Sequence, residues 1–185
     1  MRPTTLTLVS LVFVGFLARV VPHPLNFTPV IAMALVAGVY ARPRWLALAL
    51  PLAAMFLSDL LLNNTVYAAY YEGFRWLGDA GVYVAIGLCA FLPLALKTAR
   101  GSAWTQKLAT GFAGAVLFFA VTNVGVWLSS GMYPLSGAGL AACFAAAVPF
   151  FPNTLLSTLL FGAVAVTAME WRGQRAVRAA GQRVS

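Results

Sequence analysis

Long apolar runs alternate along the chain with short segments that hold most of its charged and turn-forming residues. Six runs have the hydropathy of membrane spans, although a typical span needs about 20 residues and the second run is short. We expect these helices at residues 5–21, 27–40, 45–62, 80–96, 108–128 and 153–171. A further apolar run, residues 139–150, predicts a short interfacial or re-entrant helix, which Pro149 and Pro152 separate from the sixth span.

The composition supports a membrane protein built as a single compact bundle. Of the 185 residues, 62% are hydrophobic and 9% are charged, whereas soluble domains contain about 25% charged residues. We therefore predict an all-α integral membrane protein: a six-transmembrane-helix bundle over residues 1–171, embedded in the lipid bilayer, and a basic cytoplasmic tail over residues 172–185.

Basic residues are divided unevenly between the two sets of connecting segments. With six spans, residue 2, the segments 42–44 and 97–107, and the tail fall on one side and hold ten of the twelve basic residues. The positive-inside rule places this side in the cytoplasm. We predict that both termini are cytoplasmic, and we attribute the net charge of +8 to topology signals rather than to nucleic-acid binding.

The connector between the first two runs, residues 19–29, combines an arginine, the single histidine, an asparagine and three prolines. Proline fixes φ and removes a backbone donor, so this segment is rigid and non-helical. Irregular backbone at membrane depth is tolerated where it is buried in protein or lines a wet cavity. We interpret the connector as the lip of a binding cavity, with His23 and Asn26 as candidate solute-binding residues. A tight extracellular turn is an equally supported alternative.

Two ionisable residues lie inside predicted spans, where a charge is costly and marks a candidate site. Arg19 is near the outer end of the first helix and Asp59 is near the outer end of the third. They have opposite charges at similar depth. We predict a structural ion pair between them; direct contact of one of them with a ligand is the minority alternative.

Other polar and aromatic residues cluster near the predicted outer surface. The additional candidates for solute binding are Asn123, Trp127, Tyr133, Asn153, Tyr71 and Trp76. Each has a simpler explanation: Asn123 could hold two helices together, Asn153 could cap the last helix, and the aromatic residues could form an interfacial belt.

The sequence lacks the combinations of residues on which most enzymes depend. It has four acids and one histidine, and it contains no nucleophile elbow, phosphate loop or HExxH zinc motif. A lone His23 supports neither bis-histidine haem nor a zinc site. Cys89, in the middle of the fourth run, is expected to behave as a small apolar residue, and a soft axial ligand to a metal cofactor is the minority alternative. We predict no catalytic residue, no metal site and no cofactor.

Several motifs resemble those of an uncharacterised family of small bacterial inner-membrane proteins with a suggested transport role. They are RVVPHPLNFTP at 19–29, FLSD at 56–59, TNVGVW at 122–127, GMYP at 131–134 and FPNT at 151–154. This resemblance covers nearly the whole chain and implies a multi-pass protein of the bacterial inner membrane.

The overall layout is also similar to the S components of energy-coupling-factor vitamin transporters. Those proteins have six helices, both termini inside, and a vitamin site on the outer side. The resemblance implies a site built from the first, third and fifth connectors and the outer ends of the fourth to sixth helices. It implies as partner an energy-coupling transmembrane subunit with ATPases, with a solitary transporter as the alternative. The chain departs from that family in its first helix, which has only Gly15 and Ala18 where a small-residue docking pair is typical.

Together these features favour a membrane transport protein that binds a vitamin- or cofactor-like organic solute. The stiff connector, the neutral amides and the aromatic residues suit such a solute better than a bare ion, which would need carboxylates or rings of carbonyls. The alternative is a structural or assembly subunit of a larger membrane complex, without a ligand of its own.

Overall fold

The computed structural model describes residues 3–22 and 24–181, and the regular elements of this part of the chain are helical. In chain order they are α1 (Pro3–Val20), α2 (Val30–Tyr40), α3 (Leu46–Asn64), η1 (Ala68–Tyr70), α4 (Ala80–Ala95), α5 (Trp104–Ser129), α6 (Gly137–Ala147), η2 (Val148–Phe150) and α7 (Phe151–Gly181).

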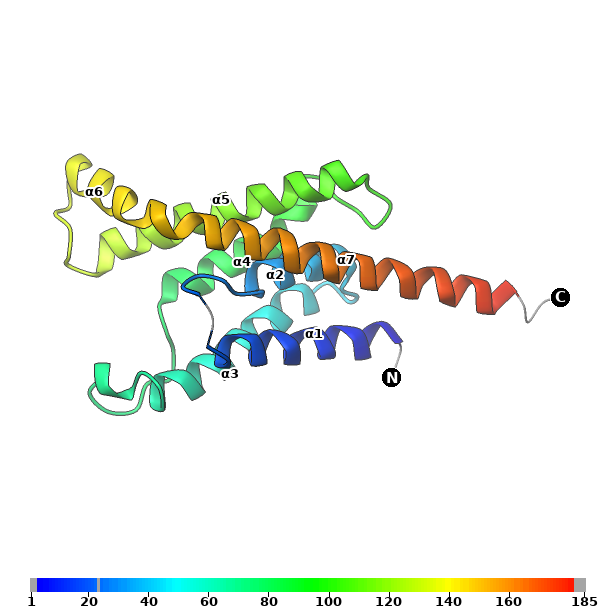
Figure 1. Cartoon of the computed structure of the whole chain (residues 1–185), viewed down its shortest axis with the longest axis horizontal. Helices are drawn as coiled ribbons and strands as arrows, with labels where there is room; N and C mark the ends of the chain where they lie inside the picture. The colour runs from blue at the N-terminus through cyan, green and yellow to red at the C-terminus, as the bar shows by residue number, and fades with distance from the viewer. Residues whose placement is uncertain (1–2, 23, 182–185) are drawn as a thin grey trace.

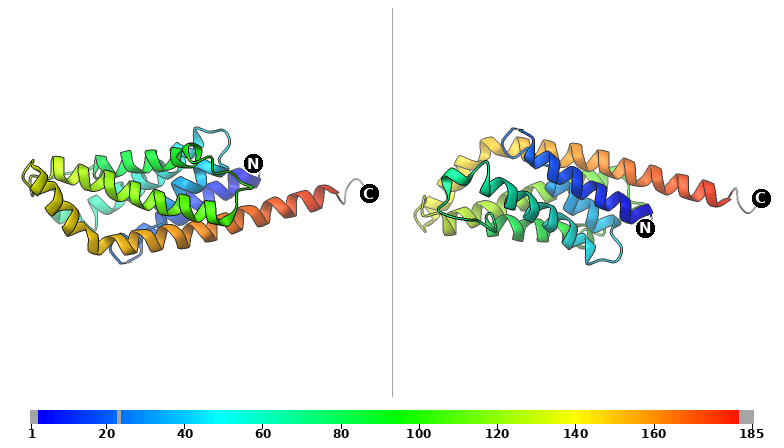
Figure 2. Two further views of the ribbon diagram at one scale, coloured as in Figure 1. Left: turned by 90° about the horizontal axis from the view of Figure 1, so that it is seen from above. Right: turned by 90° about the horizontal axis from the view of Figure 1, so that it is seen from below.

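The long helices run alternately up and down one common axis (Figure 1). The start of α1 and the end of α7 lie at one end of the bundle, which we call the terminal end. The segment 65–79, which contains η1, and the segment 130–136 lie at the opposite end, which we call the loop end. Two further views show the same arrangement, with α7 extending beyond the other helices at the terminal end (Figure 2).

Helix α2 is the centre of the bundle, although it is the shortest of the axial helices. Its sequence is apolar on every face, and nine of its 11 residues are buried. It packs against α3, α4 and α7. Eleven residues extend about 16 Å at 1.5 Å per residue, roughly half of a 30 Å hydrocarbon layer. The residues before α2 are non-helical over 21–22 and 24–29, and Val21, Leu25 and Asn26 in this connector are exposed.

Close packing of α2 against α4 depends on Gly38. A Cβ added at this position would lie 2.3 Å from the carbonyl oxygen of Ala90, a backbone atom of α4 that cannot move aside alone. We expect Gly38→Ala to destabilise the protein by about 1–3 kcal/mol, the usual cost of overpacking. Gly173→Ala, where an added Cβ has no neighbour within 4 Å, is the matched control. Thermal unfolding in detergent measures both, and equal melting temperatures would contradict the packing role of Gly38.

Three helical stretches are long and apolar enough to cross a membrane: Leu46–Asn64, Trp104–Ser129 and Gly137–Arg175. Shorter apolar helices cover Val30–Tyr40 and Ala80–Ala95. Large apolar side chains at four-residue spacing remain exposed on α5 and α7, including Leu108, Phe112, Val116, Leu156, Leu160 and Val164. Such stripes on one helix face suit contact with lipid. The chain is therefore a membrane protein with an all-helical fold.

Several boundaries differ from those expected from the sequence. Helix α2 begins at Val30 rather than at residue 27. Helix α5 begins at Trp104 rather than near residue 108, so Lys107 belongs to a helix and not to a loop. Helix α7 continues through Gly181, so residues 172–181 extend the last helix instead of forming a separate tail. Asn63 and Asn64, expected in the third connector, form the last turn of α3. No proline or glycine stands at the expected boundaries of α3 and α5, and Gly173, an isolated glycine just after the expected end of the last span, does not end α7.

The short helix before the last span was expected, and its separation from that span is slight. Helix α6 ends at Ala147, a single 3-10 turn carries Pro149, and α7 starts immediately at Phe151. Pro152 then occupies the first turn of α7, where its missing N–H costs nothing. The two prolines therefore change the direction of the helical path without interrupting it (Figure 1).

Candidate functional site

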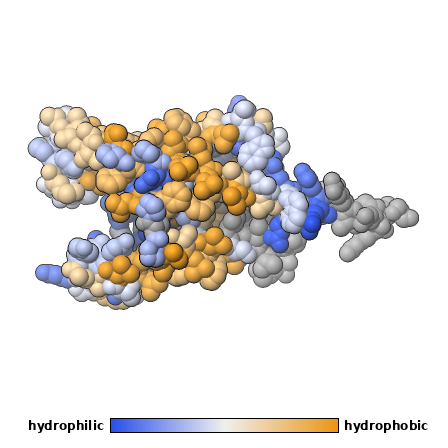
Figure 3. All heavy atoms as spheres, in the orientation of Figure 1, coloured by the Kyte–Doolittle hydropathy of each residue, from blue (hydrophilic) through white to orange (hydrophobic). Residues whose placement is uncertain are grey.

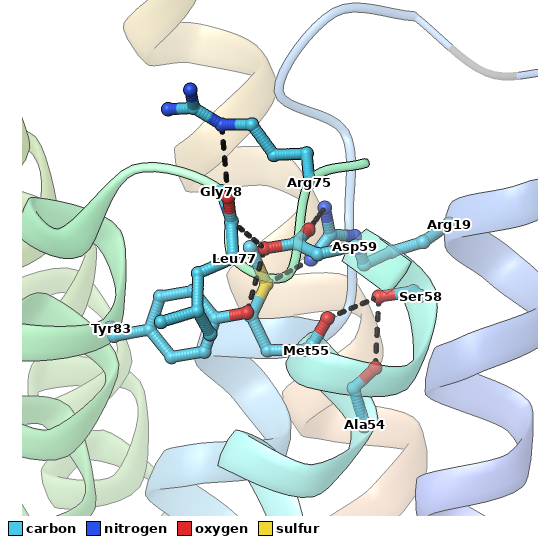
Figure 4. Close-up of polar contacts among 9 residues, drawn as sticks. All are labelled: Arg19, Ala54, Met55, Ser58, Asp59, Arg75, Leu77, Gly78 and Tyr83. Atoms are coloured by element: carbon cyan, nitrogen blue, oxygen red, sulfur yellow. Dashed lines mark hydrogen bonds and ion pairs between the residues drawn. The ribbon is translucent and has the colours of Figure 1, made fainter. Parts of the chain in front are cut away.

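A buried polar network lies where α1, α3 and α4 meet (Figure 4). Arg19 Nη2 is 2.8 Å from Asp59 Oδ1, and Arg19 Nη1 donates to the sulfur of Met55. The other carboxylate oxygen, Asp59 Oδ2, accepts from the backbone N–H of Gly78 at 3.1 Å and from the Tyr83 hydroxyl at 2.7 Å. Asp59 is 3% exposed.

The network satisfies the charge of Asp59 entirely from within the protein. The pair with Arg19, predicted from the matching depth of the two residues, is present in the structure. The Tyr83 hydroxyl and the Gly78 amide supply two further donors, so both carboxylate oxygens are occupied. Gly78 has no room for a side chain, since a Cβ there would lie 2.5 Å from Asp59 Oδ2. The network therefore fastens the segment 71–79 and the start of α4 to α1 and α3.

One turn beyond Asp59, two asparagines at the end of α3 differ in their bonding. Asn64 holds the third connector: its Nδ2 donates to the Arg75 carbonyl at 2.8 Å, and its Oδ1 accepts from the Arg75 amide at 2.8 Å. Asn63 is 6% exposed, and its Nδ2 has no hydrogen-bond partner among the described residues. Most buried amide groups are paired, so an orphaned one marks a candidate contact for a ligand. Asn63 was not among the residues expected at a site, because the sequence pattern indicated a loop at this position.

The loop end of the molecule is hollowed between two lobes (Figure 3). One lobe consists of the ends of α3 and η1 with the segment 65–79, and the other consists of the end of α5, the segment 130–136 and α6 (Figure 1). Both lobes carry exposed apolar side chains: Val66, Tyr67, Tyr70, Phe74 and Trp76 on the first, and Leu128, Met132 and Leu135 on the second.

The connector 21–29 is joined to the start of α7. The side chain of Asn153 donates from Nδ2 to the carbonyl oxygen of Leu25 at 3.0 Å, and the rings of Phe27 and Phe161 lie 5.7 Å apart. Because α7 begins at Phe151, Asn153 lies inside its first turn and is not the N-cap that the sequence suggested.

The connector itself carries two of the candidates from the sequence. Asn26, next to Leu25, is exposed and has a φ of 61°. His23 lies outside the described residues.

The candidates on α5 are bonded mainly to their own part of the chain. Asn123 Nδ2 donates to the Phe119 carbonyl at 2.7 Å, a bond within the helix. Trp127 Nε1 donates to the Pro134 carbonyl at 2.9 Å, which fixes the segment that also carries Tyr133. No described hydrogen bond joins Asn123 to Asn26 or Asn153. The structure thus places Trp127 beside the 130–136 segment and Asn153 beside the proline connector, as two separate groups.

The two aromatic candidates in the third connector lie on the opposite lobe. Tyr71 is half-buried, and the Arg75 guanidinium carbon lies 4.6 Å from the centroid of its ring. Trp76 is 64% exposed and packs edge-on against Phe74, with 4.9 Å between the ring centroids. The sequence-predicted candidates therefore surround the loop end on different elements, and they do not form one contact set.

A second charged network lies at the terminal end, and sequence reasoning missed it. Lys107 of α5 forms an ion pair with Glu170 of α7, and the Lys107 side chain is 8% exposed. The Tyr40 hydroxyl donates to the same Glu170 carboxylate at 3.2 Å, and Arg100 Nη2 donates to the Tyr40 carbonyl at 2.9 Å. Glu170 is the only acid in the last apolar run, and that isolation was the signal that could have identified the pair.

Comparison with known proteins identifies the family but not an activity. The chain belongs to a family of unknown function, DUF6580, whose family model matches residues 1–180. No curated protein and no solved structure matches the chain. The expectation of an uncharacterised membrane-protein family is confirmed to this extent, and the similarity to vitamin-transporter S components stays a prediction.

Proposed function

We propose that this DUF6580 protein is a membrane transport protein that binds a vitamin- or cofactor-like organic solute at its loop end. The observation that carries the proposal is the shortness of α2. Its 11 residues extend about 16 Å, roughly half of a 30 Å hydrocarbon layer, and the described residues of the preceding connector, 21–22 and 24–29, are non-helical. Placed at membrane depth, such non-helical backbone is expected to be buried in protein or to line a wet cavity. Leu25 and Asn26 of the connector are exposed, and the loop end is hollowed between two lobes (Figure 3).

The groups around the loop end favour a neutral or weakly polar organic solute. Exposed tyrosine, phenylalanine and tryptophan side chains on one lobe offer flat apolar surfaces. Asn26 is exposed, and Nδ2 of Asn63 is buried without a hydrogen-bond partner in the part of the chain that the structure describes. Asp59 has no free oxygen for a metal ion or a cationic solute, because Arg19, Gly78 and Tyr83 occupy both of its oxygens. Pockets that combine apolar walls with a few polar groups typically bind organic molecules.

The orientation that we propose follows from the charges. The terminal end carries Arg42, Arg44, Lys97, Arg100 and the arginines of α7, whereas the loop end carries Arg75 together with Glu72 and Asp79. The positive-inside rule then places the terminal end in the cytoplasm and opens the hollow outward. The proposal is a six-span protein of the bacterial inner membrane with both termini cytoplasmic.

Energy for uptake would have to come from a partner. The sequence contains no phosphate-binding loop, so the proposal includes an energy-coupling transmembrane subunit with ATPases, as in the S-component systems that the layout resembles. In those systems pairs of small residues on a helix surface dock the coupling subunit. Small residues on α2 and α5 cannot do so here, because Ala34 and Ala115 are fully buried and Gly38 packs against α4.

A structural or assembly subunit without a ligand is the second candidate function. The observation that favours it is the bonding of Asn123, Trp127 and Asn153, whose side-chain donors are all directed to backbone carbonyls of the protein itself. Under this alternative these residues only stabilise the loop end, and no solute is needed to complete it.

The two functions are separated by thermal unfolding of the purified protein against a panel of vitamins and cofactors, with Asn63→Leu as the diagnostic variant. Replacing an unpaired buried amide by an apolar group is expected to be neutral or stabilising without ligand. Under the transport proposal, a panel member raises the melting temperature of the wild type, and Asn63→Leu reduces that rise without loss of intrinsic stability. Asn64→Leu is the contrasting variant, because it breaks two bonds to Arg75 and destabilises the protein directly.

A panel without any stabilising solute would contradict the uptake proposal and favour the structural one. A solute that stabilises the wild type and Asn63→Leu equally would keep the transport function but exclude Asn63 from the site.

A further inference from the structure

A groove lies between α2, α5 and α7, away from the loop end of the molecule. Its empty volume is about 510 Å³, including the part that is open to the surroundings. Three small residues, Ala32, Gly111 and Gly162, let it form between closely packed helices. Along α7 its lining extends from Thr158 to Val166, about 12 Å of helix. The groove is therefore elongated along the bundle axis.

The walls of the groove offer a ligand no unpaired polar group. Half of the lining residues are aliphatic, among them Leu35, Val39, Leu108 and Leu159, and two more are glycines. The lining also contains three threonines, whose hydroxyls are bonded within the protein: Thr98 and Thr110 lie 2.6 Å apart, Thr110 donates to the Gln106 carbonyl, and Thr158 donates to the Thr154 carbonyl. The part of a ligand that occupies these walls must be apolar and slender.

The end of the groove nearest the terminal end is cationic. Lys107 and Trp104 line it, with the Lys107 ammonium nitrogen 5.5 Å from the centroid of the Trp104 ring. Lys107 has three N–H donors, and its described carboxylate partner is Glu170. Arg100, exposed beside Tyr40, has five N–H donors and directs one of them to the Tyr40 carbonyl. Two cations against one carboxylate leave a net positive charge at the mouth of the groove.

We propose that the groove binds one acyl chain of an anionic phospholipid, with the phosphate headgroup at Lys107 and Arg100. The charge at the mouth, the apolar walls and the axial orientation each match this ligand. A basic pocket between transmembrane helices is a physically favourable place for an anionic headgroup, and the indole of Trp104 suits the level of the headgroups. This lipid site is separate from the solute site proposed at the loop end.

The test measures lipid retained by the protein in delipidating detergent, by native mass spectrometry, after exposure to phosphatidylglycerol or phosphatidylcholine. Wild type is expected to retain phosphatidylglycerol in preference to phosphatidylcholine. Gly162→Leu fills the groove and is expected to lose this retention, since an added Cβ there meets only the Ala32 Cβ at 3.9 Å and the rest of the side chain has room to enter. Gly173→Leu makes the same change on α7 away from the groove and should retain lipid like wild type.

The headgroup contact is tested separately by Arg100→Gln, with Arg75→Gln at the opposite end as the control. Arg100→Gln is expected to lower the preference for phosphatidylglycerol over phosphatidylcholine, and the control is not. Retention by Gly162→Leu equal to wild type would overturn the groove assignment. Equal retention of both lipids by wild type would overturn recognition of an anionic lipid. A rise in melting temperature with inorganic phosphate equal to the rise with phosphatidylglycerol would overturn it as well.

A measurement on wild type covers the case in which Gly162→Leu does not fold. Phospholipid brominated on its acyl chains quenches nearby tryptophan fluorescence. The part of the quenching that comes from Trp104 is obtained by subtracting the quenching measured for Trp104→Phe from that of wild type. Brominated phosphatidylglycerol is expected to quench Trp104 more strongly than brominated phosphatidylcholine at equal concentration. Equal quenching by the two lipids would overturn the proposal.

Discussion

Asp59→Asn and Arg19→Gln are each expected to destabilise the folded protein by about 3–5 kcal/mol, the cost of leaving one member of a buried ion pair without its partner. The Arg19 and Asp59 side chains are 15% and 4% exposed. Asp59→Asn also weakens the bonds from Gly78 and Tyr83, so the third connector and the start of α4 lose their attachment. Thermal or denaturant unfolding in detergent measures the effect.

A charge exchange distinguishes pairing from a general loss of packing. The double variant Arg19→Asp with Asp59→Arg is expected to recover part of the stability that Arg19→Asp alone loses. Recovery should be incomplete, because the Tyr83 hydroxyl would then face a guanidinium. Glu72→Gln, at an exposed position of the same connector, is the control and should unfold like wild type. If both single variants at Arg19 and Asp59 also unfold like wild type, the network does not stabilise the bundle.

Glu170→Gln is expected to produce the second-largest loss, about 3 kcal/mol, because it leaves the buried ammonium of Lys107 unpaired. The value is at the low end of the range for buried pairs, since the Glu170 side chain is 28% exposed whereas that of Lys107 is 8% exposed. The variant should also loosen Tyr40, whose hydroxyl donates to the same carboxylate at 3.2 Å.

The reciprocal change is expected to cost less. Lys107→Met replaces the ammonium by an apolar side chain of similar length, and it leaves an acid that is partly exposed and keeps the Tyr40 hydroxyl as a donor. Unfolding in detergent should therefore rank Glu170→Gln below Lys107→Met in stability, with Arg44→Gln, an exposed terminal-end residue, close to wild type. The opposite ranking would contradict the burial of Lys107.

The sequence was sufficient to predict most helices, because apolar runs between charged or proline-rich segments are a local signal. The start of α4 at Ala80 and the separate short helix after residue 136 agree with the structure to within a few residues. The Arg19–Asp59 pair was also predictable, since two opposite charges at the same depth of neighbouring spans have few other partners.

The terminal-end network could not be assigned from the same reasoning. Lys107 follows a basic segment and resembles a topology signal, yet α5 starts at Trp104 and turns Lys107 inward. Its partner, Glu170, is 63 residues away, and only the packing of α5 against α7 brings them together. The charge of a residue is visible in the sequence, but the face of the helix on which it lies depends on where the helix starts.

The candidate site was predicted less well than the fold, for a related reason. Asn123, Trp127 and Asn153 were chosen as polar or amphipathic residues near the predicted outer surface, and each has a hydrogen-bond partner within the protein. The sequence cannot distinguish a backbone carbonyl from a ligand as that partner. Asn63 shows the converse, because its buried, unpaired Nδ2 becomes visible only after α3 is seen to continue through Asn64.

Labelling of single introduced cysteines with a membrane-impermeant maleimide tests most directly whether the hollow at the loop end faces outward. The two native cysteines, Cys89 and Cys143, are buried and give little background. Asn26→Cys reports on the connector, and Gln174→Cys reports on the terminal end of α7; both positions are exposed. We predict that Asn26→Cys reacts in intact cells and that Gln174→Cys reacts only in inverted membranes. Reaction of both from the same side, or an Asn26→Cys variant that is inert in intact cells, would contradict the account.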